Sequence, residues 1–144
     1  MTDGVLRPRE DECVIRALRE NAHAMKALRE RLVAEVLSPA ADRMGGLAEE
    51  LMRDHGLTEG EASTLLSSTI VAEALSFRTV AAGVAHSEGM QLKDIAAAWG
   101  FATASGVTRY ASEIRDAAHA QLEANQSGRP VTLDAPAGWK LLPR

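Results

Sequence analysis

The sequence predicts an all-α protein, and three features of its composition support this prediction. The chain has 144 residues, which suits one domain at ~100 to 200 residues per domain. Hydrophobic residues make up 46% and charged residues 25%, as in ordinary globular proteins. Twenty-six residues are alanine, the strongest helix former, whereas aromatic residues make up only 3%. A β-sandwich needs many more β-branched and aromatic side chains, so we expect packed helices.

The first predicted helix covers about residues 9–37. Asn21 lies within its apolar stripe, where it either fixes the register of a helix pair or sits at the edge of the face. The stripe residues recur at spacings of three and four, which indicates an amphipathic helix that buries one side. They are Val14, Leu18, Met25, Leu28 and Leu32.

Two further helices are predicted before residue 88. Ser38 followed by Pro39 should stop the first helix and start a second one, because serine suits the N-cap and proline the first helical position. The second helix should end at Gly56. Thr58-Glu59-Gly60-Glu61 has the pattern of a capping box, so a third helix starts there. Between residues 62 and 86 this helix is apolar almost all round, which predicts that it is central and buried.

The last third of the chain predicts two helices and a tail. A short helix covers residues 91–99, and a longer one covers residues 103–125 and ends at Ser127-Gly128. The tail is either two short strands around a five-residue turn or an extended strap anchored by Trp139. The expected organisation is a helical dimerisation and scaffold region over residues 1–88, a helix-turn-helix region over residues 89–128 and a basic tail or wing over residues 129–144.

Residues 89–110 have the spacing of a helix-turn-helix motif. Ile95 and the small Ala96 would face inward on the short helix, and Gly100 would supply the positive φ that the turn needs. On the second helix one face is apolar and should be buried. It consists of Val107, Tyr110, Ala111, Ile114, Ala118 and Leu122.

The same segment resembles a stretch of actinobacterial helix-turn-helix regulators. Gly89 matches their leading glycine, Asp94 takes the place of a glutamate, and Arg109-Tyr110 takes the place of Arg-Phe. The match covers about a sixth of the chain. Ala102 stands where the family has its serine cap, and Thr103-Ala104 stands where the family has the Arg-Gln pair that reaches base edges. The resemblance implies a protein that docks its second motif helix in the major groove of double-stranded DNA.

The expected DNA contacts are polar and basic side chains on the outer face of the motif and in the tail. Hydroxyl groups and one arginine would face the groove, the lysine that starts the short helix would contact phosphate, and the tail would act as a basic arm. These residues are Lys93, Thr103, Ser105, Thr108, Arg109, Ser112, Arg129 and Lys140, with Arg144 as a further basic residue of the tail.

We therefore expect a homodimeric transcriptional regulator that assembles through residues 9–37 and 62–86. The alternative is an oligomeric adaptor whose helix-turn-helix binds a protein partner and no longer reads DNA. The net charge of −4 argues against indiscriminate binding of polyanions, and the acidic first half of the chain suits the adaptor. Residues 1–62 carry nine Lys/Arg against thirteen Asp/Glu, whereas residues 63–144 carry seven of each, so all the net charge of −4 lies in the first half.

The sequence favours neither an enzyme nor a membrane protein. Glu20-x-x-His23 and Asp116-x-x-His119 have the ligand spacing of helical di-iron sites, but both pairs should face water, away from the apolar stripes. We expect no metal and no cofactor. The single cysteine, Cys13, is interpreted as a small apolar side chain. No apolar run approaches the ~18 residues of a membrane span, which predicts a cytoplasmic, nucleoid-associated protein.

Overall fold

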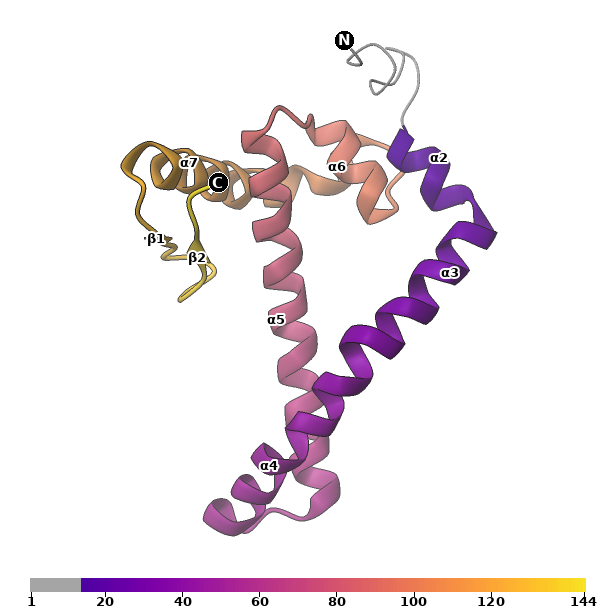
Figure 1. The fold of residues 1–144 in the computed structure, drawn as a ribbon, viewed down its shortest axis with the longest axis vertical. Coiled ribbons are helices and arrows are strands. Elements are labelled where there is room, and N and C mark those ends of the chain that lie inside the picture. The colour runs from indigo at the N-terminus through magenta and orange to yellow at the C-terminus, as the bar shows by residue number, and fades with distance from the viewer. Residues whose placement is uncertain (1–13) are drawn as a thin grey trace. The chain divides into compact units, whose positions relative to one another are not determined.

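The computed structural model describes residues 14–144, so Cys13 and the start of the first predicted helix lie outside the described residues. Almost all elements are helices, which confirms the all-α class (Figure 1). The described residues form two compact units. Unit 1 combines residues 14–21 with Ser76–Arg144, and unit 2 is Ala22–Leu75. These two units differ from the predicted regions 1–88, 89–128 and 129–144, because a short N-terminal helix packs with the C-terminal half of the chain.

The first predicted helix is interrupted at Asn21. Helix α2 spans Val14–Glu20 and helix α3 spans Ala22–Leu32. The amide of Asn21 donates to the carbonyl of Leu18 at 3.1 Å, a bond over three residues that tightens and ends the helix. Asparagine suits such a position because its short polar side chain favours turns over helix interiors. The prediction of one unbroken helix over residues 9–37 is therefore wrong.

The predicted stop at Ser38-Pro39 is also wrong, because the helix continues through it. A π-helical turn, η1 (Val33–Leu37), joins α3 to helix α4 (Ser38–His55) without a loop (Figure 1). Ser38 has helical angles, φ −64 and ψ −45, and its amide donates to the carbonyl of Val33, five residues back. Proline lacks an amide donor and clashes with the carbonyl four residues earlier. The wider π turn accommodates Pro39 by relieving that clash.

Helix α5 spans Glu59–Ser87 and starts at the predicted capping box. The amide of Glu61 donates to Thr58 Oγ1 at 3.1 Å, and the amide of Thr58 donates to Glu61 Oε1 at 2.9 Å. These bonds lower the pKa of the Glu61 carboxyl, the backbone amide of Thr58 having the largest effect. Gly56 ends α4 with φ +67, as predicted.

The first half of α5 is exposed, which contradicts the prediction of a central, buried helix over residues 62–86. Within unit 2, Ala62 alone is buried, and Val71 is 61% exposed. The second half does contribute to a core, through Val80 and Ala82 of unit 1. The apolar sequence of α5 predicts that other surfaces cover this helix. Within a single chain, only its second half is covered.

By length and composition, α5 is also the one helix among residues 14–144 that is able to cross a membrane. One such helix is weak evidence, because the core helix of a soluble protein has the same length and composition. The absence of a membrane segment stays a prediction.

Unit 1 is built on α5, helix α6 (Leu92–Trp99), a 3-10 helix η2 (Ala104–Tyr110) and helix α7 (Ala111–Ser127). Ile95, Val107 and Ile114 are the largest members of one buried cluster, which joins α6, η2 and α7 to Ala82 of α5. Gly128 ends α7 with φ +68, as predicted.

The second motif helix differs from its prediction in form, whereas its predicted apolar face is buried or half-buried at every residue but Leu122. Residues 104–110 form a 3-10 helix, which has three residues per turn, and only residues 111–127 are α-helical. Val107, Ala111, Ile114 and Ala118 are buried and Tyr110 is half-buried. Leu122 is 42% exposed, whereas Ala117, Gln121 and Ala124 are buried in its place.

The tail forms a two-stranded antiparallel sheet that packs on α7 (Figure 1). Strand β1 (Val131–Thr132) pairs with β2 (Lys140–Leu141), with Thr132 opposite Lys140. Leu133 and Leu141 are buried against Val80 of α5 and the alanines of α7. Trp139 stacks on Phe77 with ring centroids 5.8 Å apart. The two predicted alternatives, a strand pair and a strap anchored by Trp139, therefore occur together.

Candidate nucleic-acid interface

The turn after α6 is formed by Gly100. Its φ of +89 lies in the left-handed region that favours glycine, as predicted, and its amide donates to the carbonyl of Ala97 at 3.1 Å. The amide of Phe101 donates to Ala96 at 2.8 Å. These two bonds satisfy carbonyls that the end of α6 leaves without partners. The chain therefore reverses sharply after Trp99.

The short segment after the turn approaches α6 closely. A Cβ atom at Gly106 would lie 2.5 Å from Phe101 Cγ, so only glycine lets η2 come this near to the turn. Phe101 and Tyr110 both pack edge-on to Trp99, at centroid distances of 6.4 Å and 5.4 Å. These contacts hold α6, the turn and η2 in one arrangement.

An arginine of α5 completes this aromatic cluster. The guanidinium carbon of Arg78 lies 4.0 Å from the ring centroid of Trp99 and 5.7 Å from that of Tyr110. Its Nε is buried and has no hydrogen-bond partner. Cation–π attraction to the two rings compensates part of this loss. Sequence reasoning missed Arg78, because its partners lie more than twenty residues away.

The predicted docking residues of the motif all lie on the surface. Thr103, Ser105, Thr108, Arg109 and Ser112 are exposed, and so is Lys93 in the first turn of α6. The hydroxyls of Thr103 and Ser105 are hydrogen-bonded to each other at 2.6 Å, and the guanidinium carbon of Arg109 lies 5.1 Å from the Tyr110 ring centroid. The exposed residues of this segment, Thr103, Ser105, Thr108, Arg109 and Ser112, are called the docking face below.

Two arginines of α2 hold the turn beside the docking face, and sequence reasoning missed both. Arg19 Nη1 donates to the carbonyl of Ala98 at 3.0 Å. Arg16 Nη2 donates to the carbonyls of Phe101 and Ala102, each at 3.3 Å. The only sequence signal is their i, i+3 spacing, which places them on one side of a helix. It does not reveal a partner about eighty residues away.

The basic residues of the tail lie apart from the docking face. Arg129, Lys140 and Arg144 are exposed. The hairpin that carries them packs on Ala117, Ala120 and Ala124, in the later part of α7. At 1.5 Å per residue, the end of the docking face at Ser112 lies about 18 Å along the helix from Ala124. The structure therefore does not bring the two groups together as one cluster.

The two units differ in charge. The described residues of unit 1 carry nine Lys/Arg against seven Asp/Glu, a net charge of +2, whereas unit 2 carries five against nine, a net charge of −4. With residues 1–13 included, unit 1 carries eleven Lys/Arg against eleven Asp/Glu and is neutral, so the net negative charge of the chain lies in unit 2 and not in the unit that contains the docking face.

The two carboxylate–histidine pairs form no metal site in the described part of the chain. Glu20, His23, Asp116 and His119 are all exposed. No group of three or more His, Cys, Asp or Glu residues is close enough to hold a metal ion within residues 14–144.

Comparison of this chain with protein-family models, curated proteins and solved structures finds no match.

Proposed function

We propose that the protein binds double-stranded DNA as a homodimeric transcriptional regulator, with α6, the Gly100 turn and η2–α7 acting as a helix-turn-helix motif. The observation that carries this proposal is the packing of α6 and η2 around Ile95 and Val107, across a glycine with a left-handed conformation. This packing leaves the docking face of Thr103, Ser105, Thr108, Arg109 and Ser112 on the outside. In helix-turn-helix proteins, the first residues after the turn enter the major groove.

The chemistry of the docking face suits a duplex. Thr103, Ser105 and Thr108 supply hydroxyls that bind phosphates or base edges, and Arg109 supplies the one cation at the centre of the face. Lys93, at the first turn of α6, contacts phosphate. A face with one arginine gives modest base discrimination, so phosphate contacts dominate the affinity.

The tail adds contacts to the DNA backbone away from the docking face. The distance of about 18 Å along α7 from Ser112 to Ala124 equals the rise of roughly five base pairs of B-DNA at 3.4 Å per step. Arg129 and Lys140 therefore contact phosphates that flank the site occupied by the docking face, in the manner of a basic arm.

Dimerisation supplies the second half-site. The apolar side chains that unit 2 exposes, such as Leu28 and Val71 at 53% and 61%, require a covering surface. A symmetric pair of protomers covers them and presents two docking faces to one duplex.

A gel-shift titration with random and genomic duplexes tests the proposal. We expect binding to both, with tighter binding to some genomic fragments, and loss of affinity in the double variant T108E/R109E. The double variant R43E/R53E, which changes the charge on α4 of unit 2 by −4 against −3 for T108E/R109E, serves as the control and should bind like the parent. Absence of any shift with folded protein at low salt would falsify the proposal.

The second candidate function is that of an adaptor that binds another protein. Its support is the acidic, apolar surface of unit 2, together with Ala104, which offers no polar group to a base. Capture of a specific partner by a protein that shifts no duplex would favour this function over DNA binding.

A further inference from the structure

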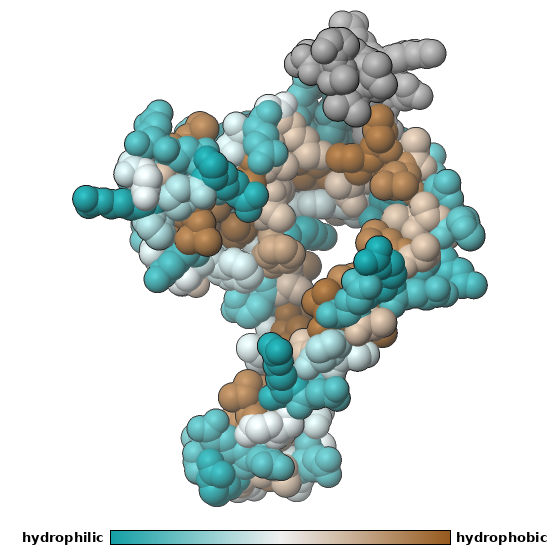
Figure 2. All heavy atoms as spheres, viewed as in Figure 1, coloured by the Kyte–Doolittle hydropathy of each residue, from teal (hydrophilic) through white to brown (hydrophobic). Residues whose placement is uncertain are grey.

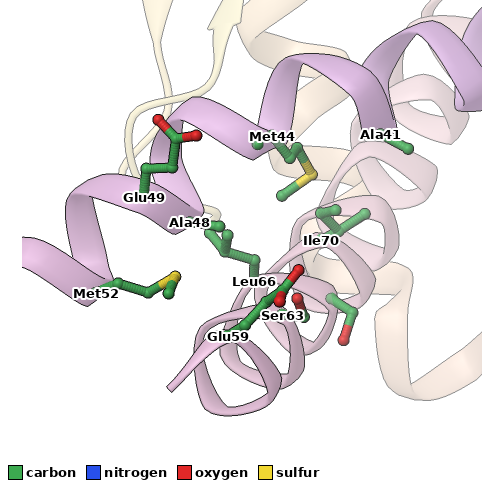
Figure 3. A pocket seen from close by; sticks show the side chains of 11 residues that line it. Ala41, Met44, Ala48, Glu49, Met52, Glu59, Ser63, Leu66 and Ile70 are labelled. Carbon is green, nitrogen blue, oxygen red and sulfur yellow. The ribbon is translucent and has the colours of Figure 1, made fainter. Parts of the chain in front are cut away.

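Unit 2 contains a groove between α4 and the first half of α5. Its volume is about 590 Å³. Met44, Ala48 and Met52 of α4 face Leu66 and Ile70 of α5 across it, as Figure 3 shows. Glu49 and Glu59 also line the groove, and no basic residue does. We call this surface the acidic groove.

The same unit exposes an apolar ridge. Leu28, Leu32 and Val36 recur at intervals of four along α3 and η1, and they are 53%, 44% and 53% exposed. Figure 2 shows hydrophobic residues at the surface along the run of α3. The flanking charges of α3 are mainly basic: Lys26, Arg29 and Arg31 against Glu30. We call this surface the basic ridge.

The basic ridge cannot fill the acidic groove of its own chain. Residues 22–55 are helical without a loop, since η1 joins α3 directly to α4. Leu28 lies sixteen residues before Met44, or about 24 Å along this helix. Because α4 is itself one wall of the groove, α3 would have to fold back on its own continuation. The ridge and the groove therefore need partners from another molecule.

We propose that the acidic groove binds the basic ridge of a second copy of this chain, so that two equivalent contacts form around a twofold axis. This inference specifies the contact that forms the homodimer of the proposed function. It rests on the proposed function only for the existence of that dimer. An amphipathic helix laid into an apolar groove is a common mode of recognition. A surface that carries both halves of the contact is self-complementary, as a twofold interface requires.

The charges of the two surfaces match. Helix α3 and η1, which carry the ridge, have a net charge of +1, with Lys26, Arg29 and Arg31 against Glu30 and Glu35, whereas α4 and α5 up to Leu75 together have a net charge of −5. Glu49 and Glu59 form no ion pair within residues 14–144, and Arg29 forms none either. Charges of opposite sign around an apolar contact fix its orientation and disfavour wrong partners.

The exposed area also fits a dimer of two chains. Ten Leu, Ile and Val side chains of unit 2 are between 43% and 61% exposed. Together they expose on the order of 800 Å², which is the area that each partner buries in a standard protein–protein interface.

A charge-swap experiment on the full chain tests this contact. The variant R29E/R31E makes the ridge acidic, and the variant E49K/E59K makes the groove basic, so each variant repels itself at both contacts. A mixture of the two pairs an acidic ridge with a basic groove and a basic ridge with an acidic groove. The variant R43E/R53E is the control, because it changes charge equally on α4 outside the groove lining.

By sedimentation and native mass spectrometry, we expect the parent and the control to be dimers. Each swap variant should self-associate at least about tenfold more weakly, and an equimolar mixture should form heterodimers. A monomeric parent, swap variants that dimerise like the parent, or a mixture that forms no heterodimer overturns the inference.

Duplex binding measured on the same samples separates this inference from the proposed function. Swap variants that dimerise normally and shift DNA disprove the groove contact alone. Heterodimers that form as expected but shift no duplex support the groove contact and disprove the DNA-binding function alone.

Discussion

Arg19 donates a hydrogen bond to the carbonyl oxygen of Ala98 at 3.0 Å, across seventy-nine positions of the chain. This bond caps the end of α6 from outside and ties α2 to the Gly100 turn. The C-terminal end of a helix carries a partial negative charge, so a guanidinium beside the last turn of α6 is favourable. Arg16 repeats the arrangement at Phe101 and Ala102.

Replacement of both arginines should loosen the turn and weaken DNA binding. Because Arg19 is exposed, we expect R16A/R19A to cost only about 1 kcal/mol of stability. The affinity for duplex should fall further than that of R43A/R53A, which removes the same charge from unit 2. Thermal melts and gel shifts on both variants measure these effects. Equal affinities for the two variants would mean that α2 does not position the docking face.

Gly100→Ala should destabilise unit 1 by about 1 to 2 kcal/mol, because an L-residue is strained at φ +89. The added Cβ would also lie 2.6 Å from Arg19 Nη2 and displace it. In a double-mutant cycle, the stability loss of G100A/R19A should therefore be smaller than the sum of the losses of G100A and R19A. Either single variant already loses the contact between Arg19 and the turn, so the double variant loses it only once. Strict additivity in urea titrations would indicate that Arg19 does not rest on the turn.

The local features of the fold were predictable from sequence, because their causes are local. Thr58 and Glu61 form the capping box, and Gly100 and Gly128 adopt the left-handed angles expected of them. Each of these depends on residues no more than four positions apart.

The errors have causes that single residues do not reveal. Ser38-Pro39 was expected to stop the first helix and start a second one, but the π turn Val33–Leu37 directly before Ser38 accommodates Pro39. Leu122 was placed in the core by a constant 3.6-residue period, whereas the tail covers the neighbouring face of α7 at Ala117, Ala120 and Ala124. The hydrogen bonds of Arg16 and Arg19 depend on distant parts of the chain. The covering of the exposed half of α5 depends on another molecule.

Truncation after Gly128 should lower the melting temperature, because it removes Leu133 and Leu141 from the core. The loss is about 3 kcal/mol or more, from the burial of two leucines. The triple variant R129Q/K140Q/R144Q changes only exposed side chains, so it should keep the melting temperature and lose DNA affinity. If the triple variant binds duplex like the parent, the tail is a structural strap without an arm function.

Lys93 and Arg109 should affect DNA binding differently. Lys93→Ala removes one phosphate contact, so it weakens binding to all sequences alike and reduces the salt slope by about one. Arg109→Ala should cost about 1 to 3 kcal/mol of binding free energy and relax specificity. Fluorescence anisotropy with several duplexes checks both. Unchanged binding in both folded variants would place the contact surface elsewhere on unit 1.

The start of α5 should lose stability in acid. The folded pKa of Glu61 lies below its ordinary value of 4.5, so the unfolded chain binds the proton more tightly. The contribution is therefore complete above pH 4.5 and is lost as the pH falls through the lower, folded pKa. Glu61→Gln should flatten this part of the pH–stability curve relative to Glu50→Gln. Parallel curves for the two variants would show that the capping bond does not form in solution.

The salt dependence of duplex affinity is the most direct measurement of whether unit 1 is a DNA-binding unit. Each neutralised phosphate contributes about −0.9 to the slope of log K against log salt concentration. Lys93, Arg109, Arg129, Lys140 and Arg144 give five cations per protomer, so we expect a slope of about −4.5 per protomer bound. A slope near zero, or no binding at low salt by a folded dimer, would contradict a DNA-binding function and leave the adaptor as the alternative.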